Sequence, residues 1–251
     1  MKAFPPDSAL VHAVRPSPNH DRRAHGLATD ILLLHYTGMT STAAAVARLC
    51  DPAVKLSSHY VIDETGEITQ LVPEGRRAWH AGVSSWEGET DINSRSIGIE
   101  IGNPGHDFGY PVFPDAQIDA VIALGRDIVA RHHIRADRVL AHSDVAPQRK
   151  SDPGEKFPWA RLYRAGVGAW VAPVENAGAC VCGPGDSGTA VADLQHALRR
   201  YGYDIEANGR YDDLTAAVVT AFQRHFRTAR VDGLADRGTI DTLDALLAAR
   251  K

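Results

Sequence analysis

The sequence predicts an α/β fold with a mixed central sheet flanked by helices, followed by a small C-terminal three-helix domain. Three observations lead to this fold class. Short apolar runs alternate with segments of helical periodicity in the first part of the chain. A stretch rich in glycine, proline and alanine follows them. Three short amphipathic segments come last, so we expect a first domain over 1–172, a linker over 173–188 and a second domain over 189–251.

Length and composition fit this division. The 251 residues suffice for a domain of roughly 150 residues plus a smaller one. The charged fraction of 23% is ordinary for a globular protein, and a net charge of −4 gives no reason to expect nucleic acid as a partner. No apolar window is long enough for a transmembrane segment. The first residues do not resemble a signal peptide, so the cytoplasm is the default expectation.

The elements of the first domain follow from periodicity. The clearest helix is expected over 115–133, where apolar residues recur every three to four positions after the start signal of Pro114 and Asp115. Its apolar face is expected to cover a sheet. The apolar runs that indicate this sheet are ILLLHY (31–36), HYVID (59–63), ITQLV (68–72), SIGIEIG (96–102) and VLAHS (139–143).

The segment between Trp170 and Thr189 reads VAPVENAGACVCGPGDSG and lacks hydrophobic periodicity, which is typical of a linker. It contains Cys180 and Cys182, which are too close in sequence for a good mutual disulfide. Together with Cys50 they make an odd number of cysteines. Since no second cysteine pair completes a four-ligand zinc site, free thiols are expected rather than half of a metal site.

Three short helices are expected after the linker, because apolar residues line one face of each segment. The three faces are Val191, Leu194, Leu198 and Tyr201; Leu214, Val218, Ala221 and Phe222; and Ile240, Leu243, Leu246 and Leu247. A domain of about 60 residues can hold a small core of its own.

Three apolar runs end in a polar side chain: His35, Glu100 and His142. Strand ends at one edge of a sheet are where open α/β proteins build their sites. A lone histidine after an apolar run is more often a capping or core residue than a ligand. His142, however, is followed ten residues later by Asp152, with Lys150 two positions before it.

Two imidazoles and one carboxylate are a recognised ligand set for catalytic zinc. A carboxylate that is near the metal without binding it can accept a proton, and Glu100 is the candidate. Lys150 can stabilise the oxyanion that forms when a carbonyl is attacked. These parts together predict Zn²⁺-dependent hydrolysis of an amide or ester. The alternative is a solvated turn in which Lys150 and Asp152 form an ordinary surface pair, and spacing alone leaves both open.

Six segments between residues 31 and 159 carry a family resemblance. In order they are LLLHYTGM, SSHYVIDETGEITQLVPE, AWHAGVSSWEG, INSRSIGIEIGNPG, FPDAQIDAVIALGRDI and VLAHSDVAPQRKSDPGEKFPW. This pattern resembles the zinc-dependent N-acetylmuramoyl-L-alanine amidases of type 2, the AmpD-like and AmiD-like enzymes. The resemblance implies that His35, His142 and Asp152 bind zinc and that Glu100 and Lys150 are catalytic. It also implies cleavage of the amide between N-acetylmuramic acid, or its anhydro form, and L-alanine of the stem peptide.

The last part of the chain resembles the small peptidoglycan-binding domain of cell-wall hydrolases. The matching segments across 185–247 are GDSGTAVADLQHALRRYGY, GRYDDLTAAVVTAFQRHF and VDGLADRGTIDTLDAL. The expected partner is therefore peptidoglycan or a muropeptide, and a monomer is expected. A wall-binding module points to the periplasm as the alternative compartment. The alternative role of this domain is to pack against the first domain. The alternative functions are a non-catalytic muropeptide sensor and a zinc peptidase that cuts within the stem peptide.

Overall fold

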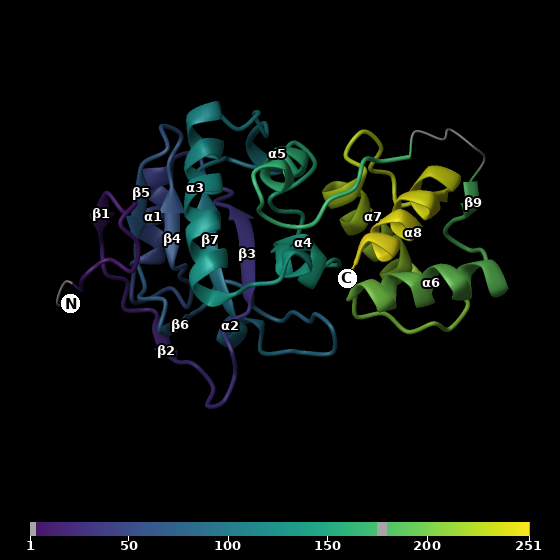
Figure 1. Ribbon diagram of the computed structural model, residues 1–251, viewed down its shortest axis with the longest axis horizontal. Helices are drawn as coiled ribbons and strands as arrows, with labels where there is room; N and C mark the ends of the chain where they lie inside the picture. Colours follow the sequence, from purple (N-terminus) through teal and green to yellow (C-terminus); the bar gives the residue numbers. More distant parts are fainter. Residues whose placement is uncertain (1–3, 175–179, 251) are drawn as a thin grey trace.

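The computed structural model describes residues 4–174 and 180–250 (Figure 1). The strands are β1 (Ala13–Val14), β2 (His20–Arg22), β3 (Ile31–Tyr36), β4 (Tyr60–Ile62), β5 (Ile68–Gln70), β6 (Arg76–Ala78), β7 (Ser96–Ile101), β8 (Val139–Ala141), β9 (Cys180–Cys182) and β10 (Ala235–Asp236). The α-helices are α1 (Thr42–Leu49), α2 (Ile92–Arg95), α3 (Asp115–His132), α4 (His142–Val145), α5 (Trp159–Arg164), α6 (Thr189–Tyr201), α7 (Asp213–Phe226) and α8 (Arg237–Ala249). Two 3₁₀ turns are η1 (His106–Phe108) and η2 (Ala136–Arg138).

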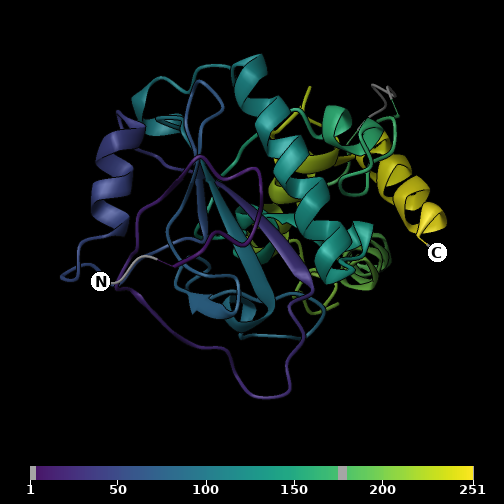
Figure 2. The ribbon, with the colours of Figure 1, turned by 60° about the vertical axis from the view of Figure 1, so that its left-hand side comes forward.

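The main sheet has six strands in the order β1-β5-β4-β7-β3-β8. β3 runs parallel to both β7 and β8, and β4 is parallel to β7 but antiparallel to β5. Each of the five apolar runs contains one of these strands, and α3 matches the expected helix to within one residue. Figure 2 shows the sheet between α1 and α3. The predicted mixed sheet flanked by helices is therefore confirmed.

The strands of the sheet divide their side chains between two faces. The three isoleucines of β7 pack in one core cluster with α3. Because successive side chains of a strand point to opposite faces, Ser96, Gly98 and Glu100 lie on the other face, here called the site face. In β3, Leu34 belongs to the α3 cluster, so the next residue, His35, falls on the site face. The alternation in SIGIEI thus places the isoleucines on the α3 face of the sheet and Glu100 on the site face.

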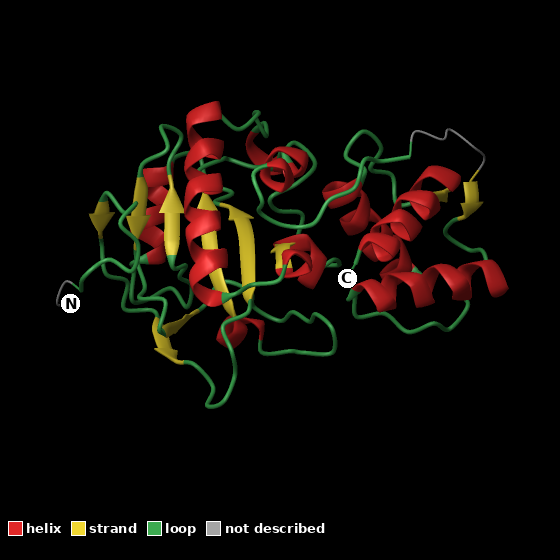
Figure 3. Cartoon of the chain, viewed as in Figure 1, coloured by secondary structure: helices red, strands yellow, loops and turns green. Residues whose placement is uncertain are grey.

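The second domain is built almost entirely of helices (Figure 3). The apolar residues assigned to the three helix faces from sequence belong to one core cluster or, for Leu214, Ile240 and Leu247, pack against it while partly buried, so the three-helix prediction is confirmed. The structure differs in the expected linker, where Cys180–Cys182 forms β9 and pairs antiparallel with β10. Cys182 is buried there, and Cys50, Cys180 and Cys182 are all free thiols. Residues 175–179 of the expected linker lie outside the described residues.

The two domains share one hydrophobic core. Trp86, Leu140 and Val145 of the first domain belong to the same cluster as Tyr201 and Tyr203 of the second. In Figure 1, α4 lies between the sheet and the second domain, and it contacts β3, β8 and α7. The second domain therefore covers the sheet beyond its edge strand β8. Among the described residues, no helix combines the length and apolar character needed to cross a bilayer.

Candidate metal centre

His35, His142 and Asp152 converge at the end of the parallel strands. His35 lies in β3, His142 begins α4 directly after β8, and Asp152 follows the loop after α4. The two Nδ1 atoms are 2.9 Å apart, and Oδ2 of Asp152 lies 3.1 Å from Nδ1 of His35 and 3.0 Å from Nδ1 of His142. All three side chains are buried. The register explains the meeting, because Leu34 pairs with Ala141 and the next residues of both strands are the two histidines.

The donor set and its geometry fit a metal ion. Nitrogen and oxygen ligands at about 2.0 to 2.1 Å from a tetrahedral zinc ion would lie about 3.3 Å from one another, slightly more than the separations found here. A ligating histidine normally donates its other N–H to a carbonyl or carboxylate. Nε2 of His142 lies 3.0 Å from the carbonyl oxygen of Ala81. Since Nε2–H donates to that oxygen, Nδ1 carries the free lone pair that a metal requires.

A second hydrogen-bond chain orients His35. Its Nε2–H donates to Nδ1 of His80 at 3.0 Å, and Nε2–H of His80 donates to the hydroxyl of Ser96 at 3.3 Å. The Ser96 hydroxyl then donates to the carbonyl of Ile92 at 2.6 Å. A Cβ atom at Gly98 would lie 2.6 Å from Nδ1 of His80, so only glycine leaves room for this ring. This series of hydrogen bonds fixes the tautomer of His35, with Nδ1 directed at His142 and Asp152.

The protonation states also suit metal binding. Burial, followed by the neighbouring imidazole of His142, lowers the pKa of His35 to about 4. Burial alone would raise the pKa of Asp152, but its interactions with His142 and His35 hold this pKa below its usual value. At neutral pH the site therefore presents a neutral imidazole and a charged carboxylate, the forms that ligate a divalent cation.

Glu100 lies beside His35, because the two residues are direct partners in the β3–β7 register. Its side chain is buried, and among the described residues its Oε2 atom has no hydrogen-bond partner. Burial, and then the charge of Asp152, raise the pKa of Glu100 well above its usual value, while Lys150 lowers it. A carboxylate in such surroundings holds a proton more strongly than a solvated one, which suits a general base.

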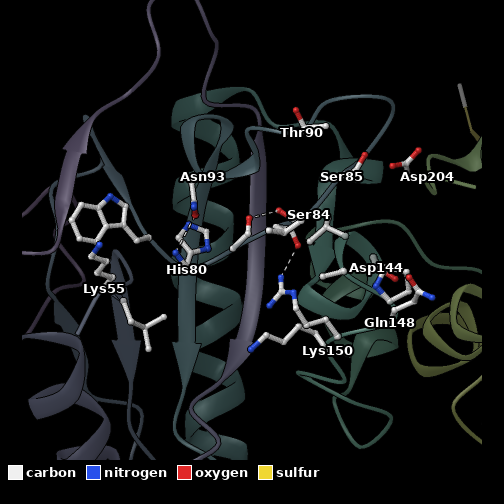
Figure 4. Close-up of a pocket in the computed structure, with 18 of the residues that line it drawn as sticks. Lys55, His80, Ser84, Ser85, Thr90, Asn93, Asp144, Gln148, Lys150 and Asp204 are labelled. Carbon is white, nitrogen blue, oxygen red and sulfur yellow. Dashed lines mark hydrogen bonds between the residues drawn. The ribbon is translucent and has the colours of Figure 1, made fainter. Parts of the chain in front are cut away.

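Lys150 and His80 line a groove of about 1190 Å³. Figure 4 shows His80 near the middle of this groove, with Lys55 toward one end and Asp204 of the second domain toward the other. Glu100 lines a smaller cavity of about 380 Å³. Glu100 is close enough to Asp152 and Lys150 for both charges to shift its pKa, which links the five residues singled out from sequence.

Two supporting residues carried no signal in the sequence. Arg149 donates from Nη2 to the carbonyl of Ala81 at 2.8 Å, the same oxygen that His142 uses, and to that of Val83 at 2.7 Å. Asp144 accepts a hydrogen bond from the backbone N–H of Ala141 at 2.8 Å. These hydrogen bonds go to backbone groups, which every residue has, so no residue pattern in the sequence predicts them. His80 lies in the segment AWHAGVSSWEG, where an aromatic residue followed by histidine is as often part of the core as of a cleft.

A buried His-His-carboxylate set on a mixed α/β sheet, with a further carboxylate beside it, is the arrangement of a metal-dependent hydrolase. Comparison with known families agrees with this class. The family model described as N-acetylmuramoyl-L-alanine amidase matches residues 25–155, and a model of a peptidoglycan binding domain matches residues 187–243. The chain belongs to the N-acetylmuramoyl-L-alanine amidase family, and the amidase activity expected from its sequence is confirmed by this membership.

Similar proteins cover most of the chain. N-acetylmuramoyl-L-alanine amidase AmiD of Escherichia coli is 42% identical over 86% of this chain and 82% of its own length. The 1,6-anhydro-N-acetylmuramyl-L-alanine amidase AmpD of Enterobacter cloacae is 34% identical over 59% of this chain and 86% of its own.

Two solved structures resemble the whole fold. The complex of E. coli AmiD with anhydro-N-acetylmuramic acid-L-Ala-D-γ-Glu-L-Lys has a TM-score of 0.77 at 38% identity and covers 91% of this chain and 93% of that one. AmpDH3 of Pseudomonas aeruginosa in complex with anhydromuramic pentapeptide has a TM-score of 0.72 at 33% identity and covers 92% and 94%. The likeness extends over both domains.

Proposed function

We propose that this chain hydrolyses the amide bond between N-acetylmuramic acid, or its anhydro form, and L-alanine of the stem peptide, with Zn²⁺ held by His35, His142 and Asp152. The observation that carries the proposal is the triangle of donor atoms 2.9 to 3.1 Å apart. The substrate class is supported by the family and by the muropeptides named in the complexes of AmiD and AmpDH3.

The mechanism assigns separate tasks to the residues around the metal. Zinc held by the three ligands supplies a Lewis acid and lowers the pKa of water to about 7. Glu100 takes the proton of the attacking water, a role that its raised pKa supports. The ammonium group of Lys150 stabilises the negative oxygen that develops on the substrate carbonyl. Glu100 then returns the proton to the departing alanine amine, so no covalent enzyme intermediate forms.

The test combines a metal assay with product analysis. The purified full-length protein should contain about one zinc ion per chain, and His142→Ala and Asp152→Ala should contain little. His196→Ala is the matched control, because His196 is exposed on α6 and lies outside the donor set. Unchanged zinc content in both ligand variants would refute the assigned site.

Mass spectrometry of digested muropeptides separates the three functions expected from sequence. An amidase releases the intact stem peptide with a free L-alanine amine, whereas a zinc peptidase releases a shortened stem. A sensor binds the muropeptide without product. The same assay bears on the compartment, because preference for soluble anhydro-muropeptides fits the cytoplasm and release of stem peptide from intact sacculi fits the periplasm.

The domain roles form part of the proposal. Residues 1–172 carry the catalysis, and residues 189–251, together with β9, form a module that binds peptidoglycan. The match of a peptidoglycan-binding model to residues 187–243 supports this division. We further propose a monomer, since one chain supplies all five site residues. Co-sedimentation with sacculi tests the binding role, and light scattering tests the oligomeric state.

A further inference from the structure

The carboxylate of Asp144 connects the two domains. Its side chain is completely buried. Oδ1 accepts a hydrogen bond from the hydroxyl of Tyr203 at 2.7 Å, and Oδ2 accepts one from Nδ1–H of His225 at 2.7 Å. Oδ2 also accepts from the backbone N–H of Ala141 at 2.8 Å. Two residues of the second domain and one backbone group of the first therefore share one carboxylate.

This carboxylate acts on the segment that carries two of the three proposed ligands. Ala141 directly precedes His142, and Asp144 itself lies in the short helix α4 that His142 begins. The backbone N–H of Ser143, also in α4, donates to the carbonyl of Asp152 at 3.1 Å. Since β8 is an edge strand, none of the described strands flanks the chain beside His142 on its outer side. The second domain occupies that side instead.

Aromatic packing holds both donors in place. The ring of His225 is stacked between Trp159 of the first domain, at 3.7 Å between centroids, and Phe226, at 3.8 Å. The ring of Tyr203 meets Trp86 of the first domain edge to face at 5.0 Å. A buried carboxylate without donors is strongly unfavourable, so Asp144 depends on these two side chains. Such rigid donors fix the position of the group that they bind.

We propose that Tyr203 and His225 of the second domain are positioning residues for the metal centre, acting through Asp144 on His142. The second domain is then a structural part of the active site in addition to any role in wall binding. The inference rests on the proposed zinc ligands. In it, the domain interface supports His142 in the way that His80 and Ser96 support His35.

The test uses full-length variants that remove one donor at a time. Tyr203→Phe deletes only the hydroxyl, and His225→Phe keeps a stacked ring without the donor. His225→Asn is the conservative variant, because its amide N–H₂ can reach the place of Nδ1. The matched control is Tyr201→Phe in the same interface, since the Tyr201 hydroxyl makes no hydrogen bond within the part of the chain that the structure describes. The readouts are the zinc dissociation constant by chelator competition, the melting temperature of the metal-free protein, and kcat and KM for a soluble muropeptide.

We expect Tyr203→Phe and His225→Phe to weaken zinc binding about tenfold each, at the lower end of the effect of outer-shell partners. Their kcat should fall at full zinc occupancy while KM is unchanged, His225→Asn should recover most of the loss, and Tyr201→Phe should match the wild type. Lower melting temperatures with unchanged zinc affinity and kcat would mean that the two residues only stabilise the fold, which overturns the inference. If the wild type itself binds no zinc, the proposed metal centre fails first.

Discussion

Replacing Glu100 by glutamine isolates proton transfer from metal binding. The substitution keeps the shape of the side chain, and among the described residues no hydrogen bond to Oε2 is lost, because that atom has no partner. The three proposed ligands are untouched. Loss of a general base typically lowers the rate by about 10² to 10⁴, which corresponds to roughly 3 to 5 kcal/mol of transition-state stabilisation. We expect kcat to fall by this factor while zinc content stays at the wild-type level.

The same variant should change the stability of the metal-free protein in a pH-dependent way. Burial raises the pKa of Glu100 in the folded state above its value in the unfolded chain, which is close to 4.5. The folded state therefore binds the proton more tightly, and wild-type stability falls as the pH rises from about 4.5. Glutamine cannot ionise, so Glu100→Gln should be more stable than the wild type at pH 7 and similar to it near pH 4.

Steady-state kinetics on soluble muropeptide, zinc analysis and thermal unfolding of the chelated protein measure these effects. Glu100→Ala provides a second variant, and it should also keep zinc and lose most turnover. Near-normal kcat in Glu100→Gln at full zinc occupancy would remove Glu100 from the mechanism. Loss of zinc would instead show that Glu100 supports the metal.

Three further changes test other parts of the site and fold. Gly98→Ala places a methyl group against the His80 ring, so zinc affinity measured by chelator competition should fall about tenfold and the free energy of unfolding by about 1 to 3 kcal/mol. Lys150→Ala should lower kcat by about 10² to 10³ with zinc content unchanged, since it removes oxyanion stabilisation; an equal loss of zinc would point to a structural role. Burial alone would raise the pKa of Glu74, but hydrogen bonds from Arg131, His132 and Tyr60 keep it below its usual value. The stabilisation by this carboxylate is therefore present above about pH 4.5 and is lost as the pH falls through the lower folded pKa. Urea unfolding of Glu74→Gln should show a loss of about 3 to 5 kcal/mol at pH 7 that shrinks on acidification, and a pH-independent difference would contradict this.

The sequence predicted the sheet because apolar runs are a local property. The structure adds which face each side chain takes: the isoleucines of β7 pack with α3, and Glu100 lies on the site face. The candidate site residues were suggested by strand endings and by the His142 to Asp152 segment. Spacing alone left a solvated turn as the alternative, and the ligand set came from the family resemblance; zinc binding by these residues stays a prediction.

Features that depend on distant partners were not predictable in the same way. β9 is three residues long within a glycine-rich segment, and it is a strand only because β10, more than fifty residues later, pairs with it. The role of Asp144 depends on side chains 59 and 81 positions away, and its immediate sequence, HSDV, resembles any short helix start. Such interactions have no period and no motif, so they appear only once the chain is folded.

The two proposed imidazole ligands are supported by different parts of the molecule. His35 is held from within the first domain by His80, whose ring fits only because position 98 is glycine. His142 is held at the domain interface, where Asp144 secures the preceding backbone group and is itself held by the second domain. The proposed ligands His35 and His142 are 107 positions apart, and the parallel register of β3 and β8 brings them together. Asp152, 117 positions from His35, reaches them from the loop after α4. Because β8 is the edge strand, the register alone leaves the His142 side of the site open, and the second domain is the element that completes it.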